Sequence, residues 1–145
     1  MDAKGSLREV GDVPGGYEDI ERMLHMRAGR DELAVEFEQE GLAVKSARWG
    51  EMHIARYTLP PGTDLTPFFA ALPDGLCSGD HYGVVLEGDI TISYRDGSEE
   101  PAEAGDVFYW PGGHTGWTER GVDFVAVTPL VQQEEIEQRI AAATG

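Results

Sequence analysis

The chain has 145 residues, of which 41% are apolar, and this suits one domain with a single core and argues against global disorder. Its 27 acidic and 11 basic side chains give a net charge of −16, so its surface would be repelled by nucleic-acid phosphates and anionic lipids. Nucleic-acid and membrane partners are therefore not expected, and no stretch has the ~18 apolar residues that a bilayer span needs.

The N-terminus and the cysteine content favour a cytoplasmic location. Residues 1–5 lack the charged and then apolar pattern of a secretory signal. Cys77 is the only cysteine, so an internal disulfide is impossible, which is compatible with a reducing compartment.

The first third of the chain predicts a loose arm, a short helix and a strand. Residues 1–16 are rich in glycine and charge, and residues 17–26 have apolar positions at helical spacing. Leu33, Val35 and Phe37 alternate with polar or small residues, as in a strand whose apolar face is buried.

From residue 42 the pattern is that of β-structure. The segment 65–72 is apolar but interrupted by prolines, which predicts an irregular segment or a short edge strand. Glu87-Gly88 predicts a sharp connection between strands, and Asp96-Gly97 predicts a type I′ hairpin turn. The expected strands are 44–49, 52–59, 81–86, 89–94, a short strand after Gly97, 107–110 and 122–128.

The last segment, 132–143, predicts an amphipathic helix that begins near Pro129. Many short strands with glycine and proline between them indicate a small barrel or sandwich. We therefore expect an N-terminal arm with a short helix and strand (1–41), a barrel (42–130) and a C-terminal helix (131–145).

Two motifs resemble those of the cupin superfamily. The run His81-Tyr82-Gly83-Val84-Val85-Leu86-Glu87-Gly88-Asp89-Ile90 resembles the end of the first cupin motif, and Gly105-Asp106-Val107-Phe108-Tyr109-Trp110-Pro111-Gly112-Gly113-His114 resembles the second. Residues 89–104 separate the two glycines, which is about the shortest spacer of the cupin pattern. The resemblance covers roughly residues 50–130.

The resemblance implies an all-β fold, the cupin double-stranded β-helix or jelly-roll barrel, here with short N-terminal and C-terminal helices. An open end of such a barrel holds a ligand pocket. Cupins commonly dimerise through N-terminal strands, so the resemblance also implies a homodimer in which the strand around Leu33 to Phe37 pairs across the interface.

The metal ligands of cupins are substituted in this chain. In the cupin pattern the glutamate ligand falls at His81, and the two histidines before it fall at Gly75 and Cys77. The histidine of the second motif falls at Gly116, while His114 lies two positions earlier. The chain is similar to small single-domain bacterial cupins with Cys-x3-His, Val-Leu-x-Gly and Pro-x-Gly-His patterns, a subgroup without an assigned reaction.

Cys77, His81 and His114 are candidate ligands of a divalent metal. Thiolate and imidazole together favour zinc, then iron, nickel or copper. The alternative stays open that no metal binds, because barrel histidines also serve as hydrogen-bonding core residues and a lone cysteine as a small buried hydrophobe.

Four side chains are candidates for catalysis, and three aromatic ones for substrate binding. His81 and His114 are joined by His53 and Tyr57, which share a strand face that either lines the pocket or meets solvent. The aromatic candidates belong to a group around the two motifs that could instead serve core packing; they are Tyr94, Tyr109 and Trp117.

The leading hypothesis is a small-molecule-binding cupin that acts as an enzyme, with a metal-assisted oxygenase, isomerase, cyclase or lyase reaction in the barrel pocket. The second is a non-catalytic, metal-free ligand-binding or sensing module. The third is an interaction protein whose exposed aromatics form a protein interface. The fold alone does not choose among them.

Overall fold

The structure is a computed structural model in which residues 27–144 are described. The predicted arm at 1–16 and helix at 17–26 lie outside the described residues. A turn within residues 27–33 carries an ion pair between Arg27 and Glu32. From residue 34 the elements are β1 (Ala34–Gln39), β2 (Leu42–Trp49), β3 (Met52–Leu59), β4 (Thr63–Asp64), η1 (Thr66–Phe69), η2 (Pro73–Gly75), β5 (His81–Tyr94), β6 (Glu99–Glu103), β7 (Val107–Trp110), β8 (His114–Thr118), β9 (Val122–Pro129) and α3 (Leu130–Thr144).

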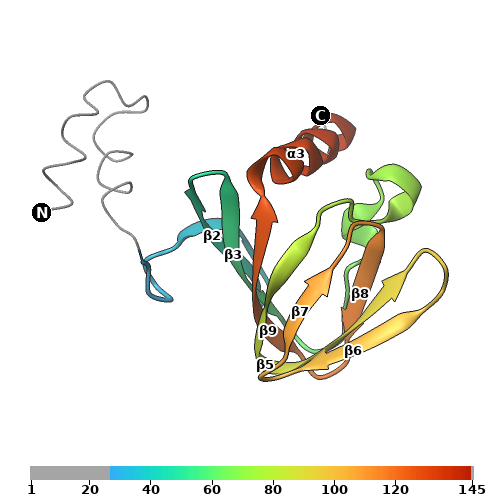
Figure 1. Ribbon diagram of the computed structural model, residues 1–145, viewed down its shortest axis with the longest axis horizontal. Helices are drawn as coiled ribbons and strands as arrows, with labels where there is room; N and C mark the ends of the chain where they lie inside the picture. Colours follow the sequence, from blue (N-terminus) through green and yellow to red (C-terminus); the bar gives the residue numbers. More distant parts are fainter. Residues whose placement is uncertain (1–26, 145) are drawn as a thin grey trace, which may run out of the picture. The chain divides into compact units, whose positions relative to one another are not determined.

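The strands form a curled barrel of two antiparallel sheets that share β5 (Figure 1). The first half of β5 pairs with β7 and β9, in the sheet that continues through β3 and β2 to β1. The second half pairs with β6 and β8, and β8 pairs with β4. The predicted all-β fold is confirmed.

Strand β5 passes from one sheet to the other, and this explains why Gly88 lies within it. The two strands expected at 81–86 and 89–94 are one continuous strand, so the predicted sharp connection is wrong. A register shift between Val85 and Glu87 bends the strand, and Gly88 has a φ of 76°. A Cβ at Gly88 would collide with the carbonyl oxygen of Gly121, so the close approach of the backbones requires glycine.

The turn after β5 differs from the predicted type I′ turn. Gly97 N–H donates to Tyr94 O (2.9 Å), and Tyr94 N–H donates to Ser98 O (2.9 Å). Gly97 has a φ of 86°, whereas Asp96 is not in the left-handed region that a type I′ turn requires. The connection is therefore a three-residue loop closed by a left-handed glycine.

Elsewhere the sequence patterns predict most elements but miss the short strands β4 and β8. Strand β3 has the expected bounds, and the segment at 65–72 contains the 3₁₀ turn η1 rather than a strand. Strand β8 was not predicted, because its sequence His-Thr-Gly-Trp-Thr does not alternate between apolar and polar residues.

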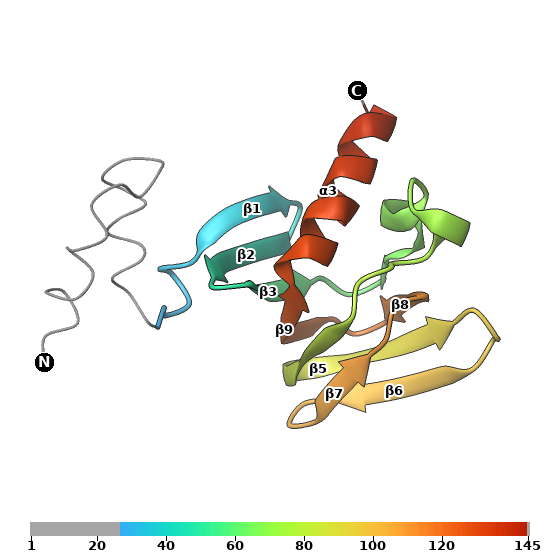
Figure 2. The same cartoon turned by 45° about the horizontal axis from the view of Figure 1, so that its top comes forward.

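The core fills the barrel between the two sheets, and α3 packs at its open end (Figures 1 and 2). Ile136 of α3 is buried and Ile140 is half-buried, as the predicted amphipathic face requires. No helix among the described residues is long and apolar enough to cross a membrane. The buried core residues of the barrel are Leu59, Val85, Ile90, Ile92, Ala102, Trp110, Val122, Phe124 and Ala126.

Candidate functional site

A cavity of about 620 Å³ opens at the end of the barrel that α3 borders. Its size is in the range of small-molecule sites. Its walls are mainly aliphatic and aromatic, with two groups of polar side chains. The apolar lining residues are Phe37, Leu42, Val44, Leu59, Leu65, Phe68, Phe69, Ile92, Trp110, Phe124, Ala126, Ile136, Ile140 and Ala141.

Cys77, His81 and His114 form the first polar group of the cavity wall. Their ligand atoms all lie within 4.8 Å of one another. Cys77 and His114 are opposite each other in an isolated antiparallel bridge, in which Cys77 N–H donates to His114 O (2.7 Å). His81 begins β5 beside Trp110 of β7, and its Nε2 lies 3.3 Å from Sγ of Cys77.

Hydrogen bonds fix how both imidazole rings are oriented. Nδ1–H of His114 donates to the carbonyl oxygen of Pro111 (2.7 Å), which leaves Nε2 with its lone pair. Nδ1 of His81 is hydrogen-bonded with Oγ1 of Thr128 (2.6 Å), and Nε2 of His81 lies 3.3 Å from Sγ of Cys77. The two rings meet edge to face with centroids 5.1 Å apart.

Burial keeps all three side chains uncharged. It lowers the pKa of His81 to about 3, helped by the neighbouring His114, and it also lowers the pKa of His114. Burial raises the pKa of the Cys77 thiol to about 11. At neutral pH the group is therefore two neutral imidazoles and a thiol.

This donor set fits a divalent metal of the zinc type. In a tetrahedral zinc site, neighbouring sulfur and nitrogen ligands are about 3.4–3.6 Å apart, so a spacing within 4.8 Å needs only a small contraction. The hydrogen bonds to Thr128 and Pro111 resemble the outer contacts that orient metal-binding histidines.

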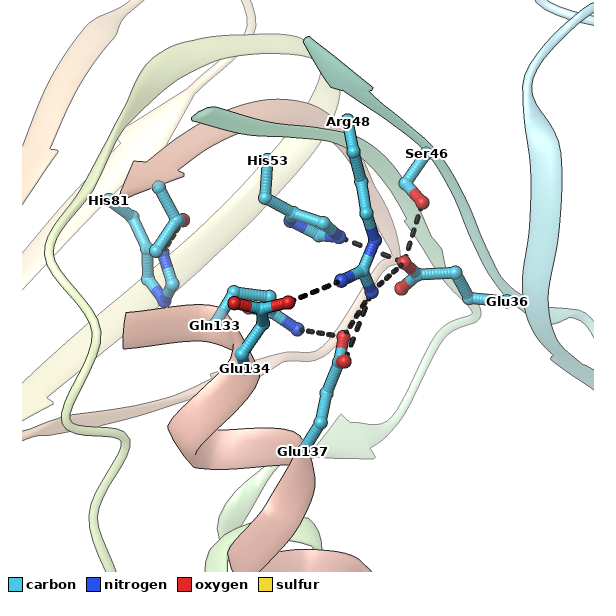
Figure 3. Close-up of polar contacts among 9 residues, drawn as sticks. Glu36, Ser46, Arg48, His53, His81, Gln133, Glu134 and Glu137 are labelled. Carbon is cyan, nitrogen blue, oxygen red and sulfur yellow. Dashed lines mark hydrogen bonds and ion pairs between the residues drawn. The ribbon is translucent and has the colours of Figure 1, made fainter. Parts of the chain in front are cut away.

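A second polar group, which the sequence did not predict, lies at the mouth of the cavity (Figure 3). Glu36 of β1 accepts hydrogen bonds from Ser46 (2.6 Å) and contacts His53 Nε2 (2.9 Å). Arg48 of β2 donates to Glu137 of α3 (2.7 Å) and to Glu36 (3.4 Å). Because Arg48 already supplies a positive charge between the two carboxylates, this group does not favour a metal ion.

The charge of Glu36 is maintained by its partners. Burial by itself raises the pKa of the Glu36 carboxyl, but hydrogen bonds from His53 and Ser46 outweigh it and bring the pKa down to about 2. The Arg48 guanidinium contributes in the same direction. A permanently ionised carboxylate thus lies at the rim of the apolar cavity.

The position of Glu36 corrects the expected face of the first strand. The alternation predicted that Val35 and Phe37 would be buried, but a register shift between them turns the strand. Val35 is 57% exposed and lies outside the cavity, whereas both Glu36 and Phe37 line it. No signal in the sequence marks this irregularity.

His53 and Tyr57 share the strand face that points into the barrel, but they do not join the Cys77 group. His53 is fully buried and contacts Glu36; its Nδ1 has no hydrogen-bond partner among the described residues. Tyr57 lines the cavity and stacks on Phe124, with ring centroids 4.9 Å apart. Burial raises its pKa, so the hydroxyl stays protonated.

The three aromatic candidates for substrate binding do not border this cavity. Tyr109 is 50% exposed and stacks on Tyr82 on the outer face of the sheet. Trp117 borders a second, polar cavity of about 500 Å³ between β5, β6 and β8. Tyr94 is half-buried, packs against the core and lies 6.4 Å from the His114 ring.

Comparison with known proteins gives the fold. No protein-family model matches the chain, and no curated protein matches it significantly. A structural-genomics protein of unknown function from Rhizobium leguminosarum bv. viciae 3841 is 24% identical; the match covers 72% of this chain and 96% of that one, with a TM-score of 0.54. An RmlC-like cupin from Shewanella frigidimarina NCIMB 400 is 15% identical over 72% and 90% of the two chains, with a TM-score of 0.53.

A structure titled Fe(II) HppE is 11% identical, with a TM-score of 0.52; the match covers 72% of this chain and 60% of that one. At these identities the likeness shows the fold alone. The chain has the cupin fold, the double-stranded β-helix that its two motifs implied.

Proposed function

We propose that this cupin-fold chain binds a small organic molecule in its barrel cavity and acts on it with the help of a divalent metal held by Cys77, His81 and His114. The observation that carries the proposal is the meeting of these three side chains, within 4.8 Å, in the wall of an apolar cavity of about 620 Å³. Oxygenation, isomerisation, cyclisation and lyase reactions all remain within this proposal.

The residues around the cavity support distinct roles. Both histidines are neutral at physiological pH, the form in which imidazole binds a metal. The chemistry that a bound divalent ion supplies is the polarisation of a substrate oxygen. The Tyr57 hydroxyl lines the cavity and serves as a hydrogen-bond donor to the ligand, while the aromatic walls exclude water.

Metal content tests the proposal directly. Protein purified without chelator or a histidine tag should contain zinc, iron, nickel or copper near one equivalent, and His81→Ala and Cys77→Ser should lose it. Gln138→Ala, an exposed change on α3, should retain the metal. Wild-type protein that takes up none of the four ions on incubation contradicts the metal-assisted function.

One observation favours a second candidate, a metal-free ligand-binding or sensing module. The 3.3 Å contact between Cys77 and His81, with a thiol pKa of about 11, is also that of a neutral thiol that donates to an imidazole. In this candidate Cys77, His81 and His114 contact the ligand by hydrogen bonds. A bound organic compound in metal-free protein, found by mass spectrometry after native purification, supports it.

A homodimer through β1 accompanies the proposal. Strand β1 ends the order of its sheet, and all six of its residues are exposed. Val35→Glu should weaken a dimer in light scattering over a dilution series, while Val107→Glu, at the 83% exposed Val107 of β7, should not. A monomeric wild type contradicts the dimer.

The proposed location is the reducing cytoplasm, because Cys77 can serve as a metal ligand only while it is not oxidised.

A further inference from the structure

Helix α3 covers the Cys77 group from outside the barrel. Ile136 of α3 packs with Leu72 and Cys77 in a small core of its own, separate from the core of the barrel. Cys77 is 3% exposed and Ile136 is 6% exposed. Part of the burial that sets the chemistry of Cys77 is therefore supplied by a helix rather than by the sheets.

Gly79 leaves no free space beneath this helix. A Cβ at Gly79 would lie 3.1 Å from Cδ1 of Ile136, 3.0 Å from Cε1 of His81 and 3.4 Å from Cγ2 of Thr128. The helix, the loop that carries Cys77 and the His81 ring consequently converge on one glycine. A displacement of α3 changes the packing around His81.

Asp80 and Gln132 join the helix to both motifs. Asp80 N–H donates to Oε1 of Gln132 (2.8 Å), and Nε2 of Gln132 donates to Oδ2 of Asp80 (2.9 Å). The other oxygen, Oδ1, accepts the N–H of Gly112 (2.9 Å). One carboxylate thus links the residue before His81, the loop before His114 and the first turn of α3.

Arg48 makes two ion pairs with α3, one with Glu137 and one with Glu134 (3.9 Å), and both are weaker than the link through Asp80. Arg48 pairs with Glu137 (2.7 Å), but both side chains are 39% exposed, and such a pair contributes little to stability (Figure 3). The base of the helix is fixed, because Leu130 N–H donates to Glu51 O (2.8 Å). Beyond this anchor, Gln133, Ile136, Glu137 and Ile140 all face the cavity.

We propose that α3 is a lid that pivots near Leu130, and that the reciprocal pair Asp80–Gln132 couples its closing to the positions of His81 and His114. The open lid gives a ligand access to the Cys77 group and the cavity. The closed lid holds the two histidine-bearing segments together through Asp80. Asp80 and Gln132 are positioning residues, and the metal-binding part of this inference rests on the proposed function.

The reactivity of Cys77 tests the lid without any metal. Cys77 is the only cysteine, so the rate of its reaction with the disulfide reagent DTNB at fixed pH reports the opening of α3 in metal-free protein. Gln132→Ala should raise this rate about tenfold, whereas Gln138→Ala should leave it unchanged. The rise should persist in low urea with little urea dependence, as local opening requires.

Either of two results contradicts the proposal that α3 acts as a lid. One is a rate in Gln132→Ala equal to that of the wild type. The other is a rise that follows the loss of global stability measured by urea unfolding, because the cysteine would then react only through complete unfolding.

Zinc binding tests the coupling. Zinc should slow hydrogen exchange of the α3 amides in the wild type, and Gln132→Ala should weaken zinc binding about tenfold and abolish this protection. Equal zinc affinity and equal protection in both proteins overturn the coupling. If the wild type binds no zinc, iron, nickel or copper, the coupling to metal and the proposed metal function both fail, while the thiol measurement still decides the lid.

Discussion

The hydroxyl of Thr128 lies 2.6 Å from Nδ1 of His81, directly beside the position of His53 on the neighbouring strand. Thr128 is fully buried in β9, and its hydroxyl sets the orientation of the His81 ring. The ring then presents Nε2 to Cys77. A residue outside both sequence motifs therefore determines whether His81 can act as a ligand.

Replacing Thr128 with valine should impair metal binding more than folding. The change keeps the shape and removes the hydroxyl, so zinc affinity should fall about tenfold, the lower end for an outer contact of a metal-binding histidine. The stability loss should be about 1–2 kcal/mol, because Nδ1 of His81 loses a buried partner. Competition with a chromogenic chelator measures the affinity. Thr58→Val, at an exposed position of β3, is the control; equal affinity in all three proteins would contradict this role.

The affinity for metal should rise with pH because metal binding releases one proton, that of the Cys77 thiol. His81 has a pKa of about 3 and burial lowers the pKa of His114 below its usual value, so protons compete little for the histidines between pH 7 and 9. The Cys77 thiol has a pKa of about 11 and must lose its proton on binding. Zinc affinity should therefore increase about tenfold per pH unit over this range. A break near pH ~6.5, the usual histidine pKa, would contradict it.

The sequence predicted the Cys77 group because its members lie within or next to two local motifs. The motif spacing brings the start of β5 beside the end of β7. Cys77 lies just before β5 and His114 just after β7, so these two residues also come together. The sequence could not predict the Glu36 group, whose members come from β1, β2, β3 and α3 and share no motif. Their meeting depends on tertiary packing that local periodicity does not encode.

The face of β1 shows a second limit of periodicity. A strand alternates strictly only while its pairing is regular, and one shift of register exchanges its two faces. The shift between Val35 and Phe37 leaves Val35 exposed and turns Glu36 toward His53. The glycine motifs predicted the fold better than periodicity did. Gly88 lies where the backbone of β5 approaches Gly121 so closely that a side chain would collide with it.

Two glycines with left-handed backbone should differ in their tolerance of alanine. Gly88→Ala should destabilise the protein by more than about 3 kcal/mol, because its Cβ adds a collision with the backbone of Gly121 to the cost of positive φ. Gly97→Ala should cost about 1 kcal/mol, since nothing lies within 4 Å of its Cβ. Urea unfolding compares the two variants. Similar losses would contradict the role of Gly88 as the point where the sheets meet.

The Glu36 carboxylate should contribute to stability above about pH 4.5 and cease to contribute as the pH falls toward 2. Its pKa is lowered from 4.5 to about 2 in the folded protein, so the unfolded chain binds the proton first as the pH falls, and acid favours unfolding. A shift of this size corresponds to somewhat more than ~3 kcal/mol, and solvent screening of this partly exposed group reduces the contribution to on the order of 2–3 kcal/mol. Glu36→Gln should therefore be less stable than the wild type by about this amount at pH 7.

The difference between wild type and Glu36→Gln should shrink steadily between pH 4.5 and 2, and urea unfolding at pH 7, 5, 4 and 3 measures it. Comparison at each pH removes the effect of the other acidic residues, whose mutual repulsion also changes as they are protonated. Glu38→Gln, at an exposed position of the same strand, is the control and should change stability little at pH 7. A difference for Glu36→Gln that stays constant from pH 7 to 3 would show that the variant loses packing rather than the charged contacts with His53 and Arg48.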